Sequence, residues 1–189
     1  RHVVNAGGLT GLQIFPDDEI EIINDEGNQI CEIICFDKDG KSELAILNLK
    51  ENSNKSFIKE ILKKKDESSL ATNFQLKKRN LDLNKSHSSI LFDEKTPSGE
   101  KIKLKSKDKC YVIFSAPQND MLVSEQNPSG DLILFVKRAK ITSDKELSII
   151  PDPVFEPHYE KNIDRQTAIS FQVKAVSYTH LTLPTSVPV

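Results

Sequence analysis

Apolar and polar residues alternate in short stretches along most of this chain. Leu12 and Ile14 precede a turn at Pro16-Asp17-Asp18, and Ile20 and Ile22 follow it. A period of two residues is typical of strands that bury one face. Similar stretches, and short apolar runs bounded by turn residues, predict strands at 29–36, 44–47, 90–92, 102–104, 110–114 and 132–136, with a further edge strand within 141–150.

One segment has a helical period instead. A helix is predicted over residues 54–65, capped by Asn52 or Ser53, because four apolar residues fall on one face and lysines on the other. These four residues are Phe57, Ile58, Ile61 and Leu62. Residues 66–87 are polar and weakly periodic, and they hint only at short strands around Phe74, Leu76, Leu81 and Leu83.

The pattern predicts a mostly β fold, an antiparallel module resembling a β-barrel or sandwich, with one short amphipathic helix. We expect this module to span residues 1–150, followed by a proline-rich linker at 151–167. Residues 168–175 echo the first strand, since Phe171-Gln172-Val173 matches Leu12-Gln13-Ile14, and we expect them to begin a truncated second module. Residues 176–189 differ in composition and are interpreted as a non-native read-through tail.

Composition narrows the class of protein. Of 189 residues, 37% are hydrophobic and 29% are charged, so the core is expected to be lean. A net charge of −2 argues against nucleic acid or an anionic membrane as a partner. No apolar run is long enough to span a bilayer, and the first residues do not resemble a signal peptide. An odd count of 3 cysteines favours a reducing compartment, and we expect a cytoplasmic protein.

The residues that could carry chemistry form no catalytic constellation. Cys31 and Cys35 share one face of a predicted strand and are expected to pack as small hydrophobes. A metal site there would need further ligands, for which only His87 and His158 are available, so no metal site is predicted. Three glycines in residues 5–11 are interpreted as a flexible opening turn, because a strand and no helix follows them.

The best polar clusters lie at strand ends. Asn28 and Gln29 end one turn, and Gln118, Asn119 and Asp120 follow a predicted central strand. These five residues are the candidates for binding a small molecule, although turn formation explains residues 118–120 equally well.

The strand–turn–strand segment resembles a known family. Ile23, Asp25, Gly27, Asn28, Gln29 and Ile30 are similar to a motif near the start of the urea carboxylase-associated protein family, with Glu32 where that family usually has Asp. The resemblance covers roughly residues 7–140, together with a short stretch at 158–175, and implies a β-barrel-like fold. The family's later Gly-x-His-Asp element has no match in this chain.

Modules of this family also precede aminomethyltransferase domains of the glycine-cleavage T-protein type. The resemblance therefore implies an N-terminal, non-catalytic module of a folate-dependent one-carbon transfer protein whose C-terminal domains are missing. No cofactor is expected in the fragment itself, and tetrahydrofolate is expected only in the parent protein. Two alternatives remain, a standalone small-molecule-binding barrel and a structural module for self-association, and the oligomeric state stays open.

Overall fold

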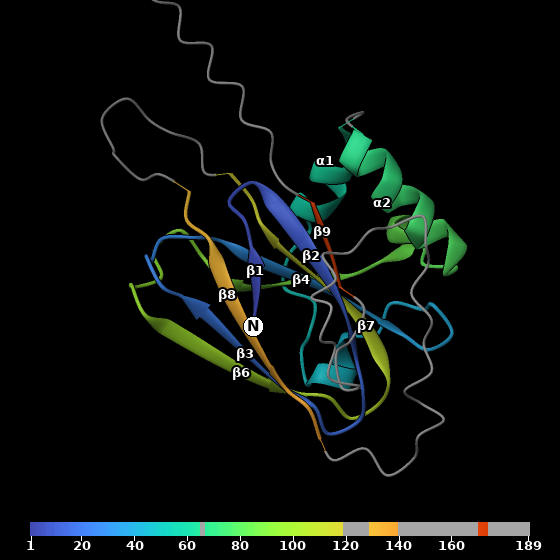
Figure 1. The fold of residues 1–189 in the computed structure, drawn as a ribbon, viewed down its shortest axis with the longest axis horizontal. Helices are drawn as coiled ribbons and strands as arrows, with labels where there is room; N and C mark the ends of the chain where they lie inside the picture. The colour runs from blue at the N-terminus through green and yellow to red at the C-terminus, as the bar shows by residue number, and fades with distance from the viewer. Residues whose placement is uncertain (65–66, 119–128, 140–169, 174–189) are drawn as a thin grey trace, which may run out of the picture.

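The computed structural model describes residues 1–64, 67–118, 129–139 and 170–173. Within these residues the chain forms two antiparallel sheets that face each other (Figure 1). The first has four strands in the order β1-β8-β3-β6. Their bounds are His2–Val4 for β1, Leu132–Lys137 for β8, Glu19–Asn24 for β3 and Glu100–Lys105 for β6.

The second sheet has five strands in the order β5-β4-β7-β2-β9. Their bounds are Ser88–Phe92 for β5, Cys31–Asp37 for β4, Cys110–Ala116 for β7, Gly8–Ile14 for β2 and Ser170–Val173 for β9. Two helices, α1 (Phe57–Lys63) and α2 (Glu67–Lys78), cover the outer face of this sheet (Figure 1). The predicted antiparallel β fold is therefore confirmed, as a sandwich with open sheet edges in the described part of the chain.

Alternation along the strands produces two cores. Side chains from the inner faces of both sheets form the first, which includes Cys31 and Cys35 as predicted. The opposite faces of β2, β4 and β7 form the second core with the helices. Strand β7 is buried along its whole length because it contributes to both cores, which explains its continuous apolar run.

The strand predicted at 44–47 is wrong. These residues form a short 3₁₀ helix, Leu44–Leu47, whose first turn is capped by the Glu43 side chain. The chain leaves this helix at Asn48, which adopts the left-handed conformation with φ 58°. A short apolar run fits a strand or a buried helical turn equally well, and the cap and the left-handed exit favour the turn here.

The predicted helix at 54–65 is confirmed in shorter form as α1, and its cap is Ser56. Asn52 has a different role, because its side-chain amide exchanges two hydrogen bonds with the backbone of Ile90, at 3.0 and 2.6 Å. Asn52 thus occupies part of the free edge of β5, where another strand would otherwise pair.

The strands suggested within 66–87 are wrong, since helix α2 and a second 3₁₀ turn, Leu83–Lys85, occupy this region. Helix α2 was missed because its buried face is largely polar: Ser69, Thr72 and Gln75 face inward. Apolar residues of this helix lie on both its buried face, as Leu76 does, and its exposed face, as Leu70 and Phe74 do, so they do not mark the buried face on which sequence patterns depend.

The glycine-rich opening was also interpreted incorrectly. Gly8 and Gly11 lie inside β2, where they pair with Ala116 and Ile113 of β7. Only Gly7 has the positive φ, 70°, of a turn. Strand β1, which precedes this turn, was not predicted.

Part of the strand predicted at 168–175 is observed as β9, which pairs with β2 at the edge of the five-stranded sheet. Its partner is thus the strand whose sequence it echoes. The edge strand expected within 141–150, the linker at 151–167 and the tail at 176–189 lie outside the described residues. The division into a module, a linker and a second module stays a prediction.

Candidate functional site

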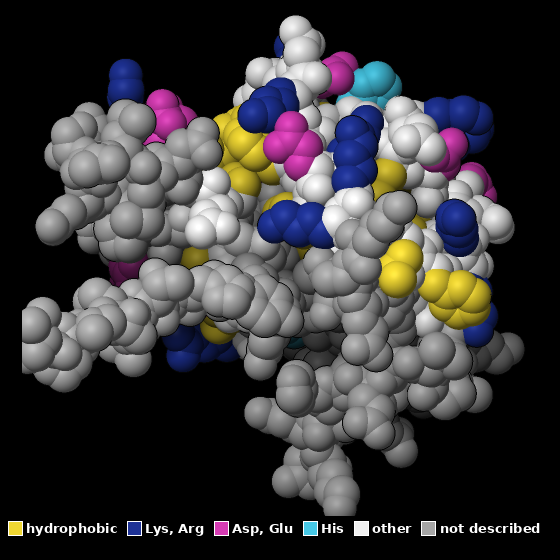
Figure 2. All heavy atoms as spheres, turned by 90° about the horizontal axis from the view of Figure 1, so that it is seen from above, with side chains coloured by type: hydrophobic (Ala, Val, Ile, Leu, Met, Phe, Trp, Pro, Cys, Tyr) yellow, Lys and Arg dark blue, Asp and Glu magenta, His cyan; other side chains and the backbone are white. Residues whose placement is uncertain are grey.

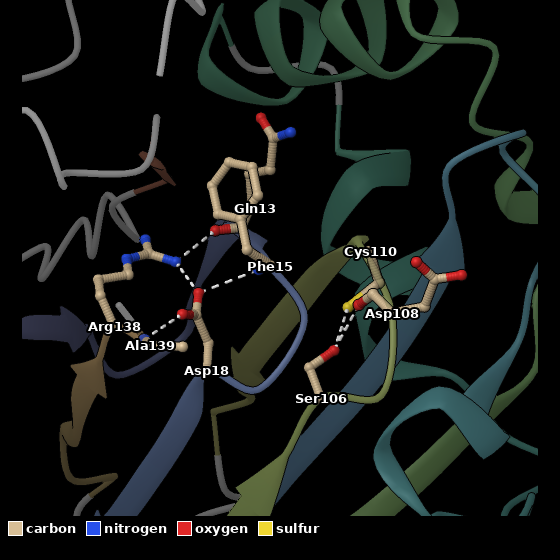
Figure 3. Close-up of polar contacts among 8 residues, drawn as sticks. All are labelled: Gln13, Phe15, Asp18, Ser106, Asp108, Cys110, Arg138 and Ala139. Carbon is tan, nitrogen blue, oxygen red and sulfur yellow. Dashed lines mark hydrogen bonds and ion pairs between the residues drawn. The ribbon is translucent and has the colours of Figure 1, made fainter. Parts of the chain in front are cut away.

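Buried polar side chains gather at the two ends of the sandwich. We call one the amide end, formed by residues 24–30, 96–99, 117–118 and 129–131 around Asn24 and Gln29. We call the other the ionic end, formed by residues 13–18, 106–110 and 138–139 around Asp18 and Arg138 (Figure 3). Strand β8 starts at the first end and finishes at the second.

Gln29 is the centre of the amide end. Its side chain is fully buried, and its amide donates to the backbone carbonyls of Pro117, at 2.8 Å, and Ile30, at 3.0 Å. Its carbonyl oxygen accepts from the backbone N–H of Gly130 at 2.9 Å. The side chain therefore ties together the turn after β3, the end of β7 and the approach to β8.

The other predicted binding residues lie differently. Asn28 is exposed in the left-handed conformation with φ 55°, and its N–H donates to Thr96 at 2.7 Å. Gln118 is exposed at the same end, next to the Pro117 carbonyl that Gln29 holds. The remaining two candidates, Asn119 and Asp120, lie outside the described residues. The structure thus brings Asn28, Gln29 and Gln118 to one end, and their binding of a small molecule stays a prediction.

Asn24 belongs to this end and was missed. Its amide nitrogen donates to the backbone carbonyl of Gln29 at 2.9 Å, whereas its fully buried Oδ1 has no partner among the described residues. The sequence places Asn24 at the start of a turn, which gives no signal that its side chain is buried.

The ionic end is organised by the carboxylate of Asp18, which is 1% exposed. One carboxylate oxygen accepts from the Arg138 guanidinium at 2.5 Å and from the Phe15 N–H at 3.0 Å. The other accepts from the Ala139 N–H at 2.9 Å. Because both oxygens are satisfied, the charge is compensated inside the fold.

Arg138 reaches the ionic end from the residues that directly follow β8. Its guanidinium also donates to the Gln13 carbonyl at 3.1 Å and lies 5.8 Å from the centre of the Phe15 ring (Figure 3). Lys109 approaches the same ring at 5.5 Å, so two cations face one aromatic side chain. A turn aspartate gives no signal of a partner 120 residues away, so this pair could not be predicted from the sequence.

A third buried polar cluster surrounds Glu32, on the helix-covered side of β4. Its Oε2 accepts from the Ile58 N–H of α1 at 2.7 Å and from the Ser115 hydroxyl at 3.4 Å. Its Oε1 is buried and has no partner within the described residues. Burial raises the pKa of this carboxyl, while hydrogen bonds from Ile58, Ser56, Ser88 and Ser115 oppose the rise. A charged residue inside the apolar run 30–36 is a signal that could have identified it.

The cysteines do not form a metal-binding centre in the described part of the chain. All three are free and buried. Burial raises the pKa of the Cys31 thiol, and hydrogen bonding with Cys110 together with burial raises that of Cys35. The Ser106 hydroxyl lies 3.4 Å from the Cys110 sulfur (Figure 3). Among the described residues, no group of three His, Cys, Asp or Glu side chains could hold a metal ion.

With this geometry in place, comparison with known proteins gives one relative. The chain is 29% identical to a trimethylamine-oxide aldolase of Ruegeria pomeroyi over 181 residues. These residues make up 96% of this chain but only 23% of the relative, so the chain spans about a quarter of that enzyme. No family model and no solved structure matches the chain.

This similarity corrects the expected function. The relative is named as an aldolase, and nothing links the chain to an aminomethyltransferase. The turn motif itself has a structural explanation: Gly27 has φ 79° with no room for a Cβ beside Ser98, Asn28 is left-handed and the Gln29 side chain fixes the turn. The backbone conformation of a tight turn explains why these residue types occur here, so they do not indicate a particular catalytic function.

One structural result bears on the membrane. No helix among the described residues is long and apolar enough to cross a bilayer.

Proposed function

We propose that this chain is the β-rich part of an enzyme similar to trimethylamine-oxide aldolase. The proposal rests on the extent of the similarity. It covers 96% of the chain and is not confined to one short motif. The proposed substrate is trimethylamine oxide or a similarly small methylated amine.

Within such an enzyme, this part would act as a rigid scaffold. Three buried polar side chains support this role, because each fixes distant segments: Asp18 binds the end of β8, Gln29 binds its approach and Glu32 binds the start of α1. Groups already engaged in this way hold the backbone in one arrangement. The remaining three quarters of the enzyme would complete the reaction site.

A hybrid enzyme tests this proposal. The 189-residue chain would replace the matched segment of the R. pomeroyi enzyme, and formaldehyde release from trimethylamine oxide would be measured. Formaldehyde is the readout because all carbons of this substrate are N-methyl groups, so a released aldehyde has one carbon. We expect release by the hybrid and none by the 189-residue chain alone. A folded hybrid without activity would contradict the proposal.

The amide end supports a second proposal, a contact for a small polar ligand at Asn28, Gln29, Gln118, Asn119 and Asp120. Because the Gln29 amide is committed to the backbone, Gln29 would fix the turn, and the exposed Gln118 side chain would meet the ligand at the end where Asn28 also lies. Titration of the ¹⁵N-labelled chain with trimethylamine oxide should shift the Asn28 and Gln118 amide signals. Shifts confined to other residues, or no shifts at high ligand concentration, would contradict this proposed contact.

The other expectations remain proposals. Membership of the urea carboxylase-associated family rests on the turn motif alone, and no family model matches. Tetrahydrofolate in a parent protein rested on the aminomethyltransferase resemblance, and no contact in the described residues supports it. A cytoplasmic location accords with three free, buried cysteines.

A further inference from the structure

Helix α2 is oriented with its polar side inward. Ser69, Thr72 and Gln75 are at most 1% exposed, whereas Leu70 is 59% and Phe74 is 55% exposed. Helices that cover a sheet normally do the reverse, with apolar side chains inward.

The buried side of α2 is committed to its own module. The Ser69 hydroxyl donates to the Ile61 carbonyl at 3.2 Å, and the Asn73 amide donates to the Leu62 carbonyl at 2.9 Å. The carbonyl oxygen of Gln75 accepts from Arg79 at 2.6 Å, and the Arg79 guanidinium lies over the Tyr111 ring. The helix therefore cannot turn Leu70 and Phe74 inward without breaking these contacts.

Leu70, Phe74 and Lys77 form one outward stripe, because residues at i, i+4 and i+7 share a helical face. Lys77 is exposed in the last turn of the helix. The side of the molecule seen in Figure 2, which includes the helical layer at the top of Figure 1, carries hydrophobic side chains beside lysines and arginines. The stripe thus offers two large apolar groups and one cation to whatever covers it.

The size of the stripe indicates what covers it. Two apolar side chains are far too little surface for a stable complex between separate molecules, which needs about 1,200 Å² or more. Within one polypeptide a small contact is sufficient, because the linked surfaces have a high effective concentration. The relative has this form, since the matched segment is 23% of its length and the rest belongs to the same chain.

We propose that the Leu70–Phe74–Lys77 stripe of α2 docks on an apolar surface with an acidic rim in the remaining part of a trimethylamine-oxide aldolase-like polypeptide. This inference rests on the proposed function. The two apolar side chains would fill the docking surface, and Lys77 would meet the acidic rim, so the contact should weaken as salt rises.

The first test uses the 189-residue chain alone. Phe74→Lys should shift its Tm by less than about 2 °C, because the side chain is exposed in the isolated chain. Leu76→Lys, on the same helix but 2% exposed, is the matched control and should prevent stable folding. A loss of stability with Phe74→Lys as large as that with Leu76→Lys would show that the chain covers Phe74 itself, and would overturn the proposal.

The second test measures protection of the stripe in the hybrid enzyme. All three native cysteines are buried, so Phe74→Cys introduces an accessible thiol for maleimide. We expect labelling in the hybrid to be at least tenfold slower than in the isolated chain, and 0.5 M salt or Lys77→Glu to restore part of the rate. Phe135→Cys, on β8 and 42% exposed, is the control and should label at similar rates in both.

Equal labelling of the Phe74→Cys variant in both proteins would overturn the docking proposal. If the hybrid does not fold, the variant chain is joined through a flexible Gly/Ser linker to the R. pomeroyi enzyme from which the matched segment has been removed, so that both parts stay in one polypeptide, and protection of the introduced thiol is measured in the same way. Formaldehyde release is recorded separately. A hybrid that releases formaldehyde but leaves this thiol accessible rejects the docking surface alone, whereas protection without formaldehyde release rejects the proposed reaction alone.

Discussion

The two ends of the sandwich fix the same strand by different means. At the amide end, a neutral side chain, Gln29, holds the backbone leading into β8. At the ionic end, the carboxylate of Asp18 holds the backbone and the arginine that follow β8. Both side chains are almost fully buried, so each depends on its hydrogen-bonding partners.

The difference lies in what happens when a partner is removed. A buried amide left without a partner costs the desolvation of one polar group, whereas a buried carboxylate left without its cation keeps an uncompensated charge. Glu32 is an intermediate case, since it is a buried carboxylate held by N–H and hydroxyl groups with no cation among its described contacts. The following experiments test the expected order of these effects on the free energy of unfolding, from the largest to the smallest.

The largest loss is expected for Arg138→Met, which leaves the Asp18 carboxylate buried without its cation. Breaking a buried ion pair from one side costs about 3–5 kcal/mol of unfolding free energy. Urea denaturation measures the loss. The neighbouring Lys137→Met is the control, because its pair with Glu19 is exposed and should contribute under about 1 kcal/mol. Equal losses for the two variants would refute a structural role for the ionic end.

Removal of the hydrogen bonds of the Gln29 side chain should lower the free energy of unfolding by less than Arg138→Met does. Gln29→Leu keeps the size of the side chain but leaves the Pro117 carbonyl and the Gly130 N–H without partners, at a cost of about 1–3 kcal/mol. Gln118→Leu, one residue after Pro117 and exposed, should be nearly neutral. The loss should not vary between pH 5 and 8, and a clear pH dependence would contradict a tie made only by neutral groups.

Glu32→Gln should change how stability depends on pH. Because burial raises the pKa of Glu32 above its unfolded value, the folded state favours the protonated carboxyl. This contribution is fully present below the unfolded pKa and is lost as pH rises through the folded pKa. The stability of Glu32→Gln relative to the native chain should therefore grow as pH rises above 4.5, the ordinary pKa of this carboxyl. Thermal unfolding at several pH values measures this difference. A difference in stability between Glu32→Gln and the native chain that shrinks as pH rises would mean that the folded state favours the ionised carboxylate.

The smallest effects are expected at Asn28, where backbone conformation dominates. With φ at 55°, Asn28→Gly should change stability by less than about 0.5 kcal/mol. Asn28→Val should cost about 1–2 kcal/mol, because a β-branched residue resists the left-handed region. Chemical denaturation of this matched pair separates the turn requirement from any loss of ligand binding. Equal stability of the two variants would show that the turn does not require a left-handed residue.

Most of the strands could be predicted because a turn ends each of them and their apolar pattern is clear. Strands β3, β6 and β8 alternate over one buried face, whereas β4 and β7 contribute to both cores and have apolar runs. Helix α2 could not be predicted, because Ser69 and Gln75 face inward and the apolar residues Leu70 and Phe74 face outward. Sequence periodicity identifies the buried face only when that face is apolar.

The candidate site could be predicted only in part. Gln29 was found because it lies next to an obvious turn, but its partners at 117 and 130 come from distant segments. Asp18 and Asn24 also looked like ordinary turn residues, although both are buried. A single sequence contains no record of which turn side chains point inward, since that depends on the docking of strands about a hundred residues away.

The place of β7 between β4 and β2 has a consequence for synthesis on the ribosome. Strands β2 and β4 emerge early, but their shared neighbour ends at Ala116, which pairs with Gly8. At roughly 5–20 residues per second, these early strands wait several seconds or longer for their partner. During that interval two apolar strands have unpaired edges, so a slower translation rate or a limited supply of chaperones should reduce the yield of native protein more than its final stability would suggest.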